Sequence, residues 1–478
     1  MRQAGSPPLS PFTEEHRIEL LTLLGENSVW TDQERRSAYG HDETEDLSFP
    51  PAVVVLPRSV EETAAVLRFA CRERLPVTPR GAGTGLSGGA LPVAGGILLS
   101  LERLDRIRRI DRDDLVAEAE VGVVTGALQA AVEEQGLYYP PDPGSRESCT
   151  LGGNLAEDAA GPHSCKYGST RKFVLGLEAV LADGSIITTG GANRKDATGY
   201  NLTQLLVGSE GTLAVITAAT LRLLPFPQAR LTLAVPFPGL RQAASAVAAI
   251  FREGSEPAAC EILERAAMEA VAAETTVPDA LLSAGATLMI ELDGADSDSV
   301  LAQAEKLAES VAAFSAGEPL VAEELRDQRR LWALRSRVGE AVKHRSLYKE
   351  ADTVVPRSRL ADLVEEAHRI AAEHGLEAIC YGHAADGNLH VNLLRGELSL
   401  DAWERQRDEA ESELFRAVVS LGGTITGEHG VGWTQRRHLG IALAPPLIEL
   451  MRAVKHSFDP KGILNPDKIF PPEDLGQD

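Results

Sequence analysis

The stretch PRGAGTGLSGG, from Pro79 to Gly89, places five glycines in eleven positions directly after a predicted strand. Glycine permits positive φ angles and close backbone approach, so successive N–H groups in such a loop can converge on an anion such as a pyrophosphate. The nicotinamide dinucleotide motif needs a helix immediately after the glycines, whereas the next predicted element here is the strand GGILLSL. The pattern therefore argues against a nicotinamide site. It leaves an anion-binding loop of another kind or a glycine-rich turn without a ligand.

Strands and helices alternate on both sides of this loop. Residues 52–57 predict a short strand, the amphipathic stretch that Ser59 opens predicts a helix over 59–74, and PVTPRG predicts a second strand. Residues 114–136 are typical of a strand leading into a helix, residues 139–172 show little regular periodicity, and Asp183-Gly184 marks a hairpin. Pro225, Phe226 and Pro227 form a domain seam. Beyond it, strand–helix pairs with short returns predict an α+β sandwich rather than a large parallel sheet.

Size and composition limit the function classes. A chain of 478 residues exceeds one usual core and suggests two or three domains. The formal net charge of −23 argues against a nucleic-acid partner and against broad docking on anionic lipid. Five scattered cysteines without CxxC spacing indicate a reducing compartment. Residues 1–16 contain no apolar signal core and no run of eighteen apolar residues occurs, so we expect a soluble, cytoplasmic protein.

The stretch CYGHAADGNLHVNLL, from Cys380 to Leu394, holds two histidines around an Asp-Gly pair, the strongest short-range signal for a two-residue hairpin turn. With that pair at the centre of the turn, His383 lies directly across from His390. Opposed Cβ atoms on one face of a hairpin are roughly 5 Å apart, so one cation could bridge the two rings. Asn392 points to the same face. The alternative is a polar hairpin whose histidines face water, and this stretch alone does not decide.

A second segment, TLGGNLAEDAAGPHSCKYG, offers small residues and Asn154 for contact with a planar ligand. A strand followed by PRGAGTGLSGG, then by DPGSRESCTLGGNLAEDAAG and LVGSEGTLAVIT, resembles the FAD domain of the vanillyl-alcohol-oxidase type of flavoproteins. The resemblance is closest to the branch of FAD-linked D-2-hydroxyacid dehydrogenases, which includes the glycolate oxidase catalytic subunit, D-lactate dehydrogenase and D-2-hydroxyglutarate dehydrogenase. It extends from about residue 40 to 470.

The resemblance implies a two-domain α+β fold: an FAD-binding domain over 1–225, a substrate or cap domain with the metal site over 226–425, and a segment, 426–478, that returns to the FAD domain. It also implies the residues that bind FAD. The pyrophosphate would lie on Arg80, Gly81, Ala82, Gly83, Thr84, Gly85, Leu86 and Ser87; the flavin and ribityl region on Pro143, Thr150, Gly153, Asn154 and Gly161; the adenine side on Gly211 and Ile216; and Asn465 would return to the flavin. Members with covalently attached flavin often carry a histidine in the first loop. This loop has none, so we expect dissociable FAD.

The motif pair of this branch, HxxDGNxH and GEHG, stands here at 383–390 and 427–430. The resemblance makes His383, His390 and Glu428 the ligands of a divalent metal. Two imidazoles and one carboxylate suit zinc, manganese or iron and do not choose among them. The reaction implied is oxidation of a 2-hydroxy acid, in which the α-hydrogen leaves as a hydride to flavin N5 and a base takes the hydroxyl proton. Our candidate for that base is His429, which is adjacent to a ligand on a glycine-flanked turn.

The segment RLWALRSRVGEAVKHRSLYKEADTVVP matches the part of these enzymes that binds the substrate carboxylate. By that match Arg335 would clamp the carboxylate, Lys349 would assist, and Asn392 would hydrogen-bond the substrate beside the metal. Without the resemblance, arginines on this helix are typical of a solvated face. Gly339 stands where 2-hydroxyglutarate enzymes tend to carry a threonine, which favours a monocarboxylate such as D-lactate or glycolate.

We therefore expect FAD-dependent oxidation of a D-2-hydroxy acid, with D-lactate or glycolate favoured, to the 2-oxo acid. The alternative within enzymes is a D-2-hydroxyglutarate dehydrogenase. Alternatives of other classes are a metal-dependent hydrolase and a non-catalytic flavin-binding subunit, and the intact histidine and glutamate motifs speak against the last. We expect a homodimer and leave open partner subunits with iron–sulfur clusters. The electron acceptor is open among oxygen, a quinone, a cytochrome and an electron-transfer flavoprotein, and loose membrane association is open with it.

Overall fold

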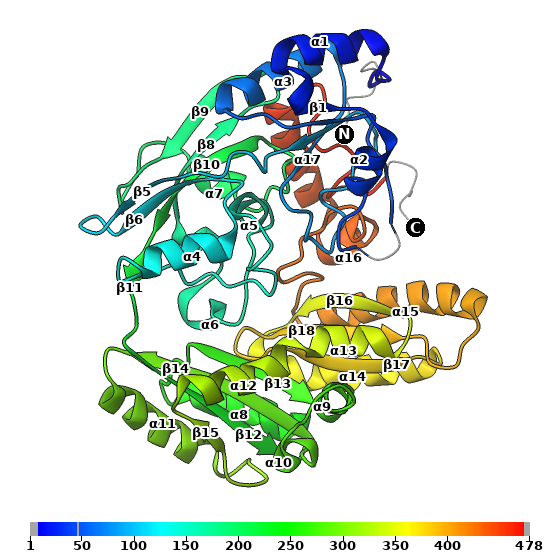
Figure 1. The fold of residues 1–478 in the computed structure, drawn as a ribbon. Helices are drawn as coiled ribbons and strands as arrows, with labels where there is room; N and C mark the ends of the chain where they lie inside the picture. Colours follow the sequence, from blue (N-terminus) through cyan, green and yellow to red (C-terminus); the bar gives the residue numbers. More distant parts are fainter. Residues whose placement is uncertain (1–7, 45–46, 473–478) are drawn as a thin grey trace. The chain divides into compact units, whose positions relative to one another are not determined.

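The computed structural model describes residues 8–44 and 47–472, coloured along the chain in Figure 1. The chain divides into two compact units. The first unit comprises residues 1–160, 169–226 and 428–478, and the second comprises 161–168 and 227–427. Part of the N-terminal stretch in which we expected no signal core, residues 1–7, lies outside the described residues. No helix within the described ranges is both long and apolar enough to cross a membrane.

The first unit opens with the predicted alternation of strands and helices. Helix α3 (Val60–Glu73) begins after Ser59, whose hydroxyl accepts the backbone N–H of Glu62 at 3.3 Å, as an N-cap does. The strands predicted around this helix are confirmed. They form a four-stranded sheet in the order β1-β2-β4-β3, in which β2, β3 and β4 run parallel: β1 (Val29–Trp30), β2 (Val53–Val55), β3 (Val77–Arg80) and β4 (Ile97–Ser100).

A second, antiparallel sheet follows in the same unit, in the order β5-β6-β10-β8-β9. The hairpin predicted at Asp183-Gly184 is confirmed, because β8 and β9 pair with Val180 opposite Ile186. The strands are β5 (Ile107–Asp111), β6 (Val116–Glu120), β8 (Val174–Val180), β9 (Ile186–Gly190) and β10 (Val215–Arg222), and a short pair is formed by β7 (Leu137–Tyr138) and β11 (Leu224–Pro225).

The stretch 139–172, which showed little periodicity, contains the short helices α5 (Leu151–Glu157) and α6 (Ser164–Tyr167). The two glycines of α5 interrupt the apolar periodicity by which a helix is recognised in a sequence. A Cβ at Gly152 would lie 2.8 Å from the Cβ of Val121, so this helix packs on the sheet through a residue that has no side chain. Helix α6 lies in the segment 161–168 and belongs to the second unit. Besides α3 and α5, the helices of the first unit are α1 (Glu14–Leu24), α2 (Gln33–Ala38), α4 (Thr125–Glu133), α7 (Leu202–Leu206), α16 (Leu439–Ala442) and α17 (Pro445–Phe458).

The second unit is built on a seven-stranded antiparallel sheet in the order β15-β12-β14-β13-β17-β18-β16. This confirms the prediction of an α+β arrangement rather than a large parallel sheet. The strands are β12 (Ala229–Phe237), β13 (Ala259–Glu264), β14 (Ala286–Gly294), β15 (Leu320–Ala322), β16 (Tyr348–Val354), β17 (Glu377–His383) and β18 (Asn388–Leu394). The helices are α8 (Leu240–Arg252), α9 (Arg265–Ala272), α10 (Asp279–Leu282), α11 (Ser297–Val311), α12 (Leu325–Ser336), α13 (Val338–Arg345), α14 (Leu360–Glu373) and α15 (Leu400–Ser420).

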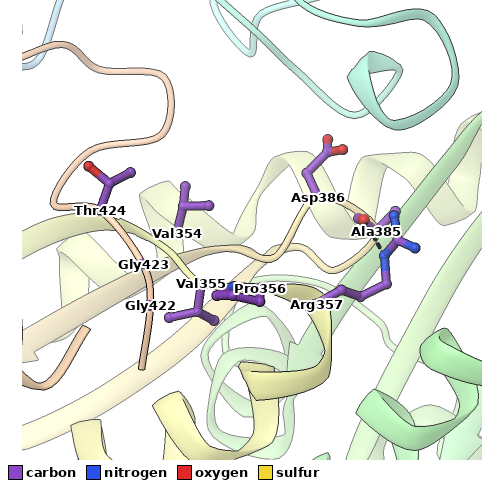
Figure 2. A pocket seen from close by; sticks show the side chains of 9 residues that line it. All are labelled: Val354, Val355, Pro356, Arg357, Ala385, Asp386, Gly422, Gly423 and Thr424. Atoms are coloured by element: carbon purple, nitrogen blue, oxygen red, sulfur yellow. Dashed lines mark hydrogen bonds between the residues drawn. The ribbon is translucent and has the colours of Figure 1, made fainter. Parts of the chain in front are cut away.

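A surface pocket of about 470 Å³ lies beside the loop that joins β17 to β18 (Figure 2). Arg357 donates from Nε to the backbone oxygen of Ala385 at 2.7 Å, the bond drawn in the figure, and its guanidinium lies 3.6 Å from the centroid of the Phe251 ring. The remaining lining is mostly small or apolar. No residue predicted to bind substrate, cofactor or metal lines this pocket, so we assign it no role.

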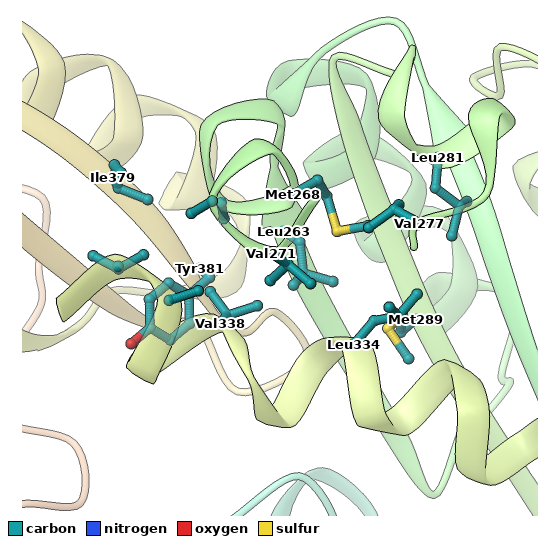
Figure 3. Packing of buried hydrophobic residues seen from close by; sticks show 14 of the residues in the cluster. Leu263, Met268, Val271, Val277, Leu281, Met289, Leu334, Val338, Ile379 and Tyr381 are labelled. Carbon is teal, nitrogen blue, oxygen red and sulfur yellow. The ribbon is translucent and has the colours of Figure 1, made fainter. Parts of the chain in front are cut away.

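One face of the seven-stranded sheet is covered by α9, α12 and α13 (Figure 3). Leu263 and Tyr381, from β13 and β17, pack there against Leu334 and Val338 from α12 and α13. Burying such large side chains contributes about 1.5–3 kcal/mol each. This apolar layer fixes where α12, the helix that carries Arg335, lies on the sheet.

Candidate functional site

The two histidines of the HxxDGNxH motif lie on neighbouring strands of the second unit, but not as the sequence predicted. Tyr381, not His383, is directly opposite His390, and His383 is instead opposite Glu261 of β13. The predicted two-residue turn is therefore wrong, because residues 384–387 form a four-residue connection. Gly387 has φ +74°, and a Cβ there would lie 2.0 Å from the backbone oxygen of Val355, so the Asp-Gly pair packs against the end of β16 rather than closing a tight hairpin.

The two imidazoles are still neighbours, as diagonal positions on one face of a sheet are. Their ring centroids are 5.5 Å apart. Oε1 of Glu261 is hydrogen-bonded to His383 Nδ1 at 2.7 Å, and Oε1 of Glu350 lies 3.1 Å from His390 Nδ1, within ion-pair distance. Metal-binding histidines commonly pair one ring nitrogen with a carboxylate in this way, which sets the tautomer and directs the other nitrogen to the metal. The pair therefore has the chemistry of metal ligands that present Nε2.

Glu261 is a site residue that the sequence analysis missed. It is fully buried, and its second oxygen, Oε2, accepts a hydrogen bond from Arg335 Nε at 2.7 Å. Burial alone would raise the pKa of Glu261, but the adjacent His383 and Arg335 lower it to about 2. The signal that could have found it is a glutamate inside the apolar run AACEIL, because a buried charge needs partners.

Arg335 and Asn392, both predicted to bind substrate, belong to this face of the sheet. The guanidinium of Arg335 lies 5.2 Å from the centroid of the Tyr381 ring. Asn392 is fully buried beside the Tyr381 hydroxyl, and among the described residues its amide makes no hydrogen bond of ordinary geometry. An unsatisfied buried amide costs about 1–3 kcal/mol, so such a group is typical of a binding site rather than of a core.

Lys349, predicted to assist the carboxylate clamp, lies on β16 next to Glu350. Directly opposed residues of an antiparallel pair share a face. Lys349 is opposite Leu393, whereas Glu350 is opposite Asn392. The side chain that β16 contributes beside Asn392 is therefore Glu350, and Lys349 belongs to the other face.

Asp352 on β16 ties the chain that leads to the GEHG motif to the same sheet. Its Oδ1 accepts a hydrogen bond from the Asn388 side-chain amide at 2.6 Å, and its Oδ2 accepts one from the hydroxyl of Thr426 at 2.9 Å and one from the backbone N–H of Gly427 at 2.7 Å. Glu428 is the next residue along the chain. It belongs to the first unit together with His429, whose Nε2 lies 3.9 Å from Glu428 Oε1.

The segment 161–168, which contains the predicted flavin contact Gly161, is part of the second unit. His163 Nε2 lies 3.0 Å from Oε1 of Glu291, Ser164 donates to Asp386 at 2.7 Å, and Tyr167 donates to Asp293 at 2.5 Å. Burial would raise the pKa of Glu291, and the hydrogen bond from His163 holds it below its ordinary value. Polar side chains of this segment thus anchor it to β14 and to the loop after His383.

A second His/Cys/Glu cluster lies on the opposite face of the sheet. Glu264 uses both carboxylate oxygens, one 2.8 Å from His368 Nε2 and one accepting the Cys380 backbone N–H at 2.7 Å. Burial raises the pKa of the Cys380 thiol well above its usual value, so the thiol stays protonated. The cluster is a satisfied ion pair next to an inert thiol, and we assign no metal to it.

In the first unit, the glycine-rich loop is shaped by contacts that only glycine allows. A Cβ at Gly81 would lie 2.3 Å from Thr150 Oγ1, and a Cβ at Gly83, where φ is +76°, would lie 2.0 Å from the Arg80 guanidinium. Arg80 donates to the backbone oxygen of His41 at 2.6 Å. Among the described residues, the buried hydroxyls of Ser87 and Thr150 have no hydrogen-bond partner in the protein. A loop of this shape with unsatisfied hydroxyls fits a phosphate-bearing cofactor.

The C-terminal segment, which contains Asn465, holds this loop in place. The Asn465 side chain donates to the backbone oxygens of Gly89 at 2.9 Å and Glu210 at 2.7 Å, and so joins two predicted cofactor motifs. Lys468 Nζ donates to the backbone oxygens of Gly88 and Leu91, and burial lowers its pKa to about 7.

The other predicted cofactor residues of the first unit lie close to this loop or in its supporting core. Gly211 has φ +66° and packs on Pro79, at the start of the loop. Asn154 is buried and donates to Thr125 Oγ1 at 2.6 Å, so its amide supports α5. Pro143 and Ile216 are buried, and Gly153 lies near Thr150.

Glu210 is a further residue that the sequence analysis did not assign. Its carboxylate accepts the backbone N–H groups of Val431 at 2.9 Å and Gly432 at 2.6 Å, which follow His429 in the chain. Glu157 lies beside it, and a Cβ at Gly430 would be 2.2 Å from Glu157 Oε2. Burial raises the pKa of both carboxyls. The turn after His429 is therefore held by Glu210, and the Glu157 carboxylate packs against Gly430 beside it.

The fold, together with two family matches, defines a two-domain FAD-linked oxidoreductase. Residues 51–190 match the FAD binding domain and residues 226–469 match the C-terminal domain of FAD linked oxidases. The chain belongs to this family of FAD-linked oxidases. It is 36% identical over 465 residues to the glycolate oxidase subunit GlcD of Bacillus subtilis, covering 96% of this chain and 97% of that protein. It is 41% identical over 439 residues to a D-lactate dehydrogenase of Archaeoglobus fulgidus, covering 90% and 95%.

Solved structures of low sequence identity share the fold. The crystal structure of p-cresol methylhydroxylase with substrate bound superposes with a TM-score of 0.80 at 18% identity, covering 95% of this chain and 96% of that one. The predicted fold class, a two-domain flavoprotein of the vanillyl-alcohol-oxidase type, is confirmed.

Proposed function

We propose that this protein oxidises a small D-2-hydroxy acid, with D-lactate or glycolate favoured, to the corresponding 2-oxo acid. Two relatives of nearly full coverage are named as a glycolate oxidase subunit and a D-lactate dehydrogenase. The observation in the structure that carries the proposal is the single sheet face that presents His383 and His390, each with a carboxylate at Nδ1, together with Arg335 and Asn392.

The first unit would hold FAD without a covalent bond. Backbone amides of the loop 80–87 would bind the pyrophosphate, with Ser87 and Thr150 supplying hydroxyls. Bound FAD supplies the two-electron acceptor for the α-hydrogen of the substrate. The glycines of the loop and the bonds of Asn465 keep the backbone in the shape that this contact needs.

A divalent metal, zinc, manganese or iron, would bind to His383, His390 and Glu428. The two imidazoles have the carboxylate partners that such ligands usually have, and Asp352 fixes the backbone of the residue before Glu428. A metal held there would lower the pKa of the substrate hydroxyl and orient the substrate.

Three side chains would act on the substrate itself. Arg335 binds the carboxylate through its guanidinium, as a bidentate pair. Asn392 offers a buried amide to the substrate beside the metal ligands. His429 takes the hydroxyl proton, a step that contributes about 10²–10⁴-fold when a base is well placed. Glu210 keeps the turn after His429 in place through two backbone hydrogen bonds.

A small substrate agrees with the surroundings of Gly339. A Cβ at this position of α13 would lie 3.3 Å from the Tyr381 hydroxyl, so the helix and the phenol are in close contact. No side chain at 339 provides a partner for a second substrate carboxylate. This favours a monocarboxylate over 2-hydroxyglutarate.

The protein would work with further components. The name of the Bacillus subtilis relative marks it as a subunit of a glycolate oxidase. We propose likewise that this chain, as a homodimer, passes electrons to a separate acceptor, and that partner subunits connect the two. Mixing the substrate-reduced protein with oxygen, a quinone, a cytochrome or an electron-transfer flavoprotein, and timing the return of the flavin absorbance, identifies the acceptor class.

The test is an anaerobic visible spectrum of the purified protein before and after addition of D-lactate, L-lactate, glycolate or D-2-hydroxyglutarate. We expect yellow flavin absorbance that bleaches with D-lactate or glycolate. Bleaching by D-2-hydroxyglutarate alone would contradict the substrate class. Flavin absorbance that no hydroxy acid changes would contradict the reaction. Repeating the measurement after chelation tests the metal, and full bleaching of a metal-free protein would remove the metal from the proposal.

A further inference from the structure

We infer that Glu261 is a positioning residue that couples two binding functions, because it orients His383 for the metal and Arg335 for the substrate carboxylate. The inference rests on the proposed function and deepens it. It explains why a glutamate stands in the middle of a buried strand, and it makes metal binding and substrate binding depend on one side chain.

The geometry gives each carboxylate oxygen of Glu261 one partner. Oε1 lies 2.7 Å from His383 Nδ1, and Oε2 lies 2.7 Å from Arg335 Nε. Glu261 is fully buried and directly opposite His383 in the pairing of β13 with β17. Because both oxygens are hydrogen-bonded, the carboxylate cannot rotate toward one partner without weakening its bond to the other.

For His383 the bond to Glu261 decides which ring nitrogen faces the metal. A proton on Nδ1 that is donated to Glu261 leaves the lone pair on Nε2, which is the form a metal ligand needs. Carboxylate partners of this kind fix the orientation of the ring and raise its basicity as a ligand. Without the carboxylate, neither the tautomer nor the orientation of the His383 ring would be fixed.

For Arg335 the same carboxylate fixes the direction of the guanidinium. Nε is held by Glu261, and the group lies 5.2 Å from the centroid of the Tyr381 ring. The two contacts orient the terminal Nη groups, which bind a carboxylate in a bidentate pair. A buried glutamate that served only the stability of the sheet would need a single cation, whereas this one joins two residues of the proposed site.

The experiment compares Glu261→Gln with Glu264→Gln in the full-length protein with FAD bound. Glu264 is the matched control, because it is a buried glutamate on the same strand that pairs with His368 on the opposite face. The readouts are FAD absorbance, the affinities for Mn²⁺ and Zn²⁺ by competition with a chelator, and kcat and KM for D-lactate. We expect Glu261→Gln to retain FAD, to lose about 10–100-fold in metal affinity and to raise KM. We expect Glu264→Gln to keep the metal affinity of the wild type.

The inference is overturned if Glu261→Gln binds the metals as tightly as the wild type while both variants lose similar thermal stability, since Glu261 would then serve only the sheet. If that result is found while the wild-type protein binds metal and oxidises D-lactate, the proposed function is still supported and only the role of Glu261 is excluded. A wild type that binds neither metal overturns both. Should Glu261→Gln fail to fold, Glu261→Asp keeps the charge but is too short to reach both partners, and it is expected to lose metal affinity and raise KM by smaller factors.

The coupling itself is measured by adding Arg335→Lys. If Glu261 acts through Arg335, the rise in KM of the double variant Glu261→Gln/Arg335→Lys is smaller than the product of the two single rises. A double variant whose KM rises by the full product would show independent action and would overturn the coupling.

Discussion

The carboxylate of Asp352 accepts the backbone N–H of Gly427 at 2.7 Å, one residue before Glu428. The same carboxylate binds the side chains of Asn388 and Thr426. Asp352 is also directly opposite His390 in the pairing of β16 with β18. Asp352 therefore fixes the point at which the chain leaves the sheet that carries His383 and His390. Glu428, the third proposed ligand, follows directly after that point in the chain.

Replacing Asp352 by Ala should weaken metal binding without touching a proposed ligand. It removes three hydrogen bonds to a charged acceptor, each worth about 1.5–3 kcal/mol, and leaves buried donors without a partner. We expect the free energy of unfolding to fall by about 3 kcal/mol or more and the affinity for Mn²⁺ or Zn²⁺ to fall with it. Denaturant unfolding and chelator competition measure the two effects. The control is Asp362→Ala, which removes surface ion pairs with Arg359 and Arg241 and should leave both near the wild-type values.

Replacing His429 by Ala should remove activity and leave the flavin in place. If His429 is the base, kcat for D-lactate falls by about 10²–10⁴-fold, while FAD absorbance and thermal stability stay close to those of the wild type. The matched control is His344→Ala, because His344 forms an exposed pair with Glu274 away from the proposed site. Full activity in His429→Ala would exclude it as the base.

The acid stability of the second unit should depend on Glu261. Its pKa is lowered from 4.5 to about 2, so the unfolded chain binds the proton first as the pH falls. The stabilisation is complete above pH 4.5 and is lost as the pH falls toward 2. Its size corresponds to about 3 kcal/mol. We expect the free energy of unfolding of the wild type to fall more steeply between pH 4.5 and 3 than that of Glu261→Gln. Equal slopes in urea titrations at several pH values would contradict the assignment.

Replacing Gly387 by Ala should destabilise the connection between the two histidine strands. The new Cβ would lie 2.0 Å from the backbone oxygen of Val355, in addition to the cost of a positive φ, so the strands must shift. We expect a loss of about 2–4 kcal/mol in unfolding free energy together with weaker metal binding. Gly254→Ala is the matched control, because Gly254 has φ +75° with no atom closer than 3.9 Å to its Cβ position. Similar losses in both variants would mean that the backbone angle alone matters.

Much of the fold was accessible from local pattern. Ser59 before an amphipathic run, the Asp183-Gly184 turn and the glycine loop after a strand each leave a signal within a few residues. The register of the histidine strands was not accessible, since it depends on the contact of Gly387 with Val355, a neighbour more than thirty positions away in the chain. Glu261, Glu350 and Asp352 were missed for the same reason. Their partners lie on neighbouring strands, on α12 or in the segment after α15, and no spacing along the chain reveals those contacts.

The chain passes between the two units four times, after residues 160, 168, 226 and 427. Neither unit is therefore a contiguous piece of the gene. A fragment that begins at residue 227 would lack 161–168 and with it the partners of Glu291, Asp293 and Asp386. Expression of the second unit alone would expose the buried carboxylates of Glu291 and Asp293 on the sheet, and it would remove Ser164 from the already exposed Asp386 in the loop beside the histidines. A circularly permuted gene or a linker carrying the eight missing residues would be needed to study that unit in isolation.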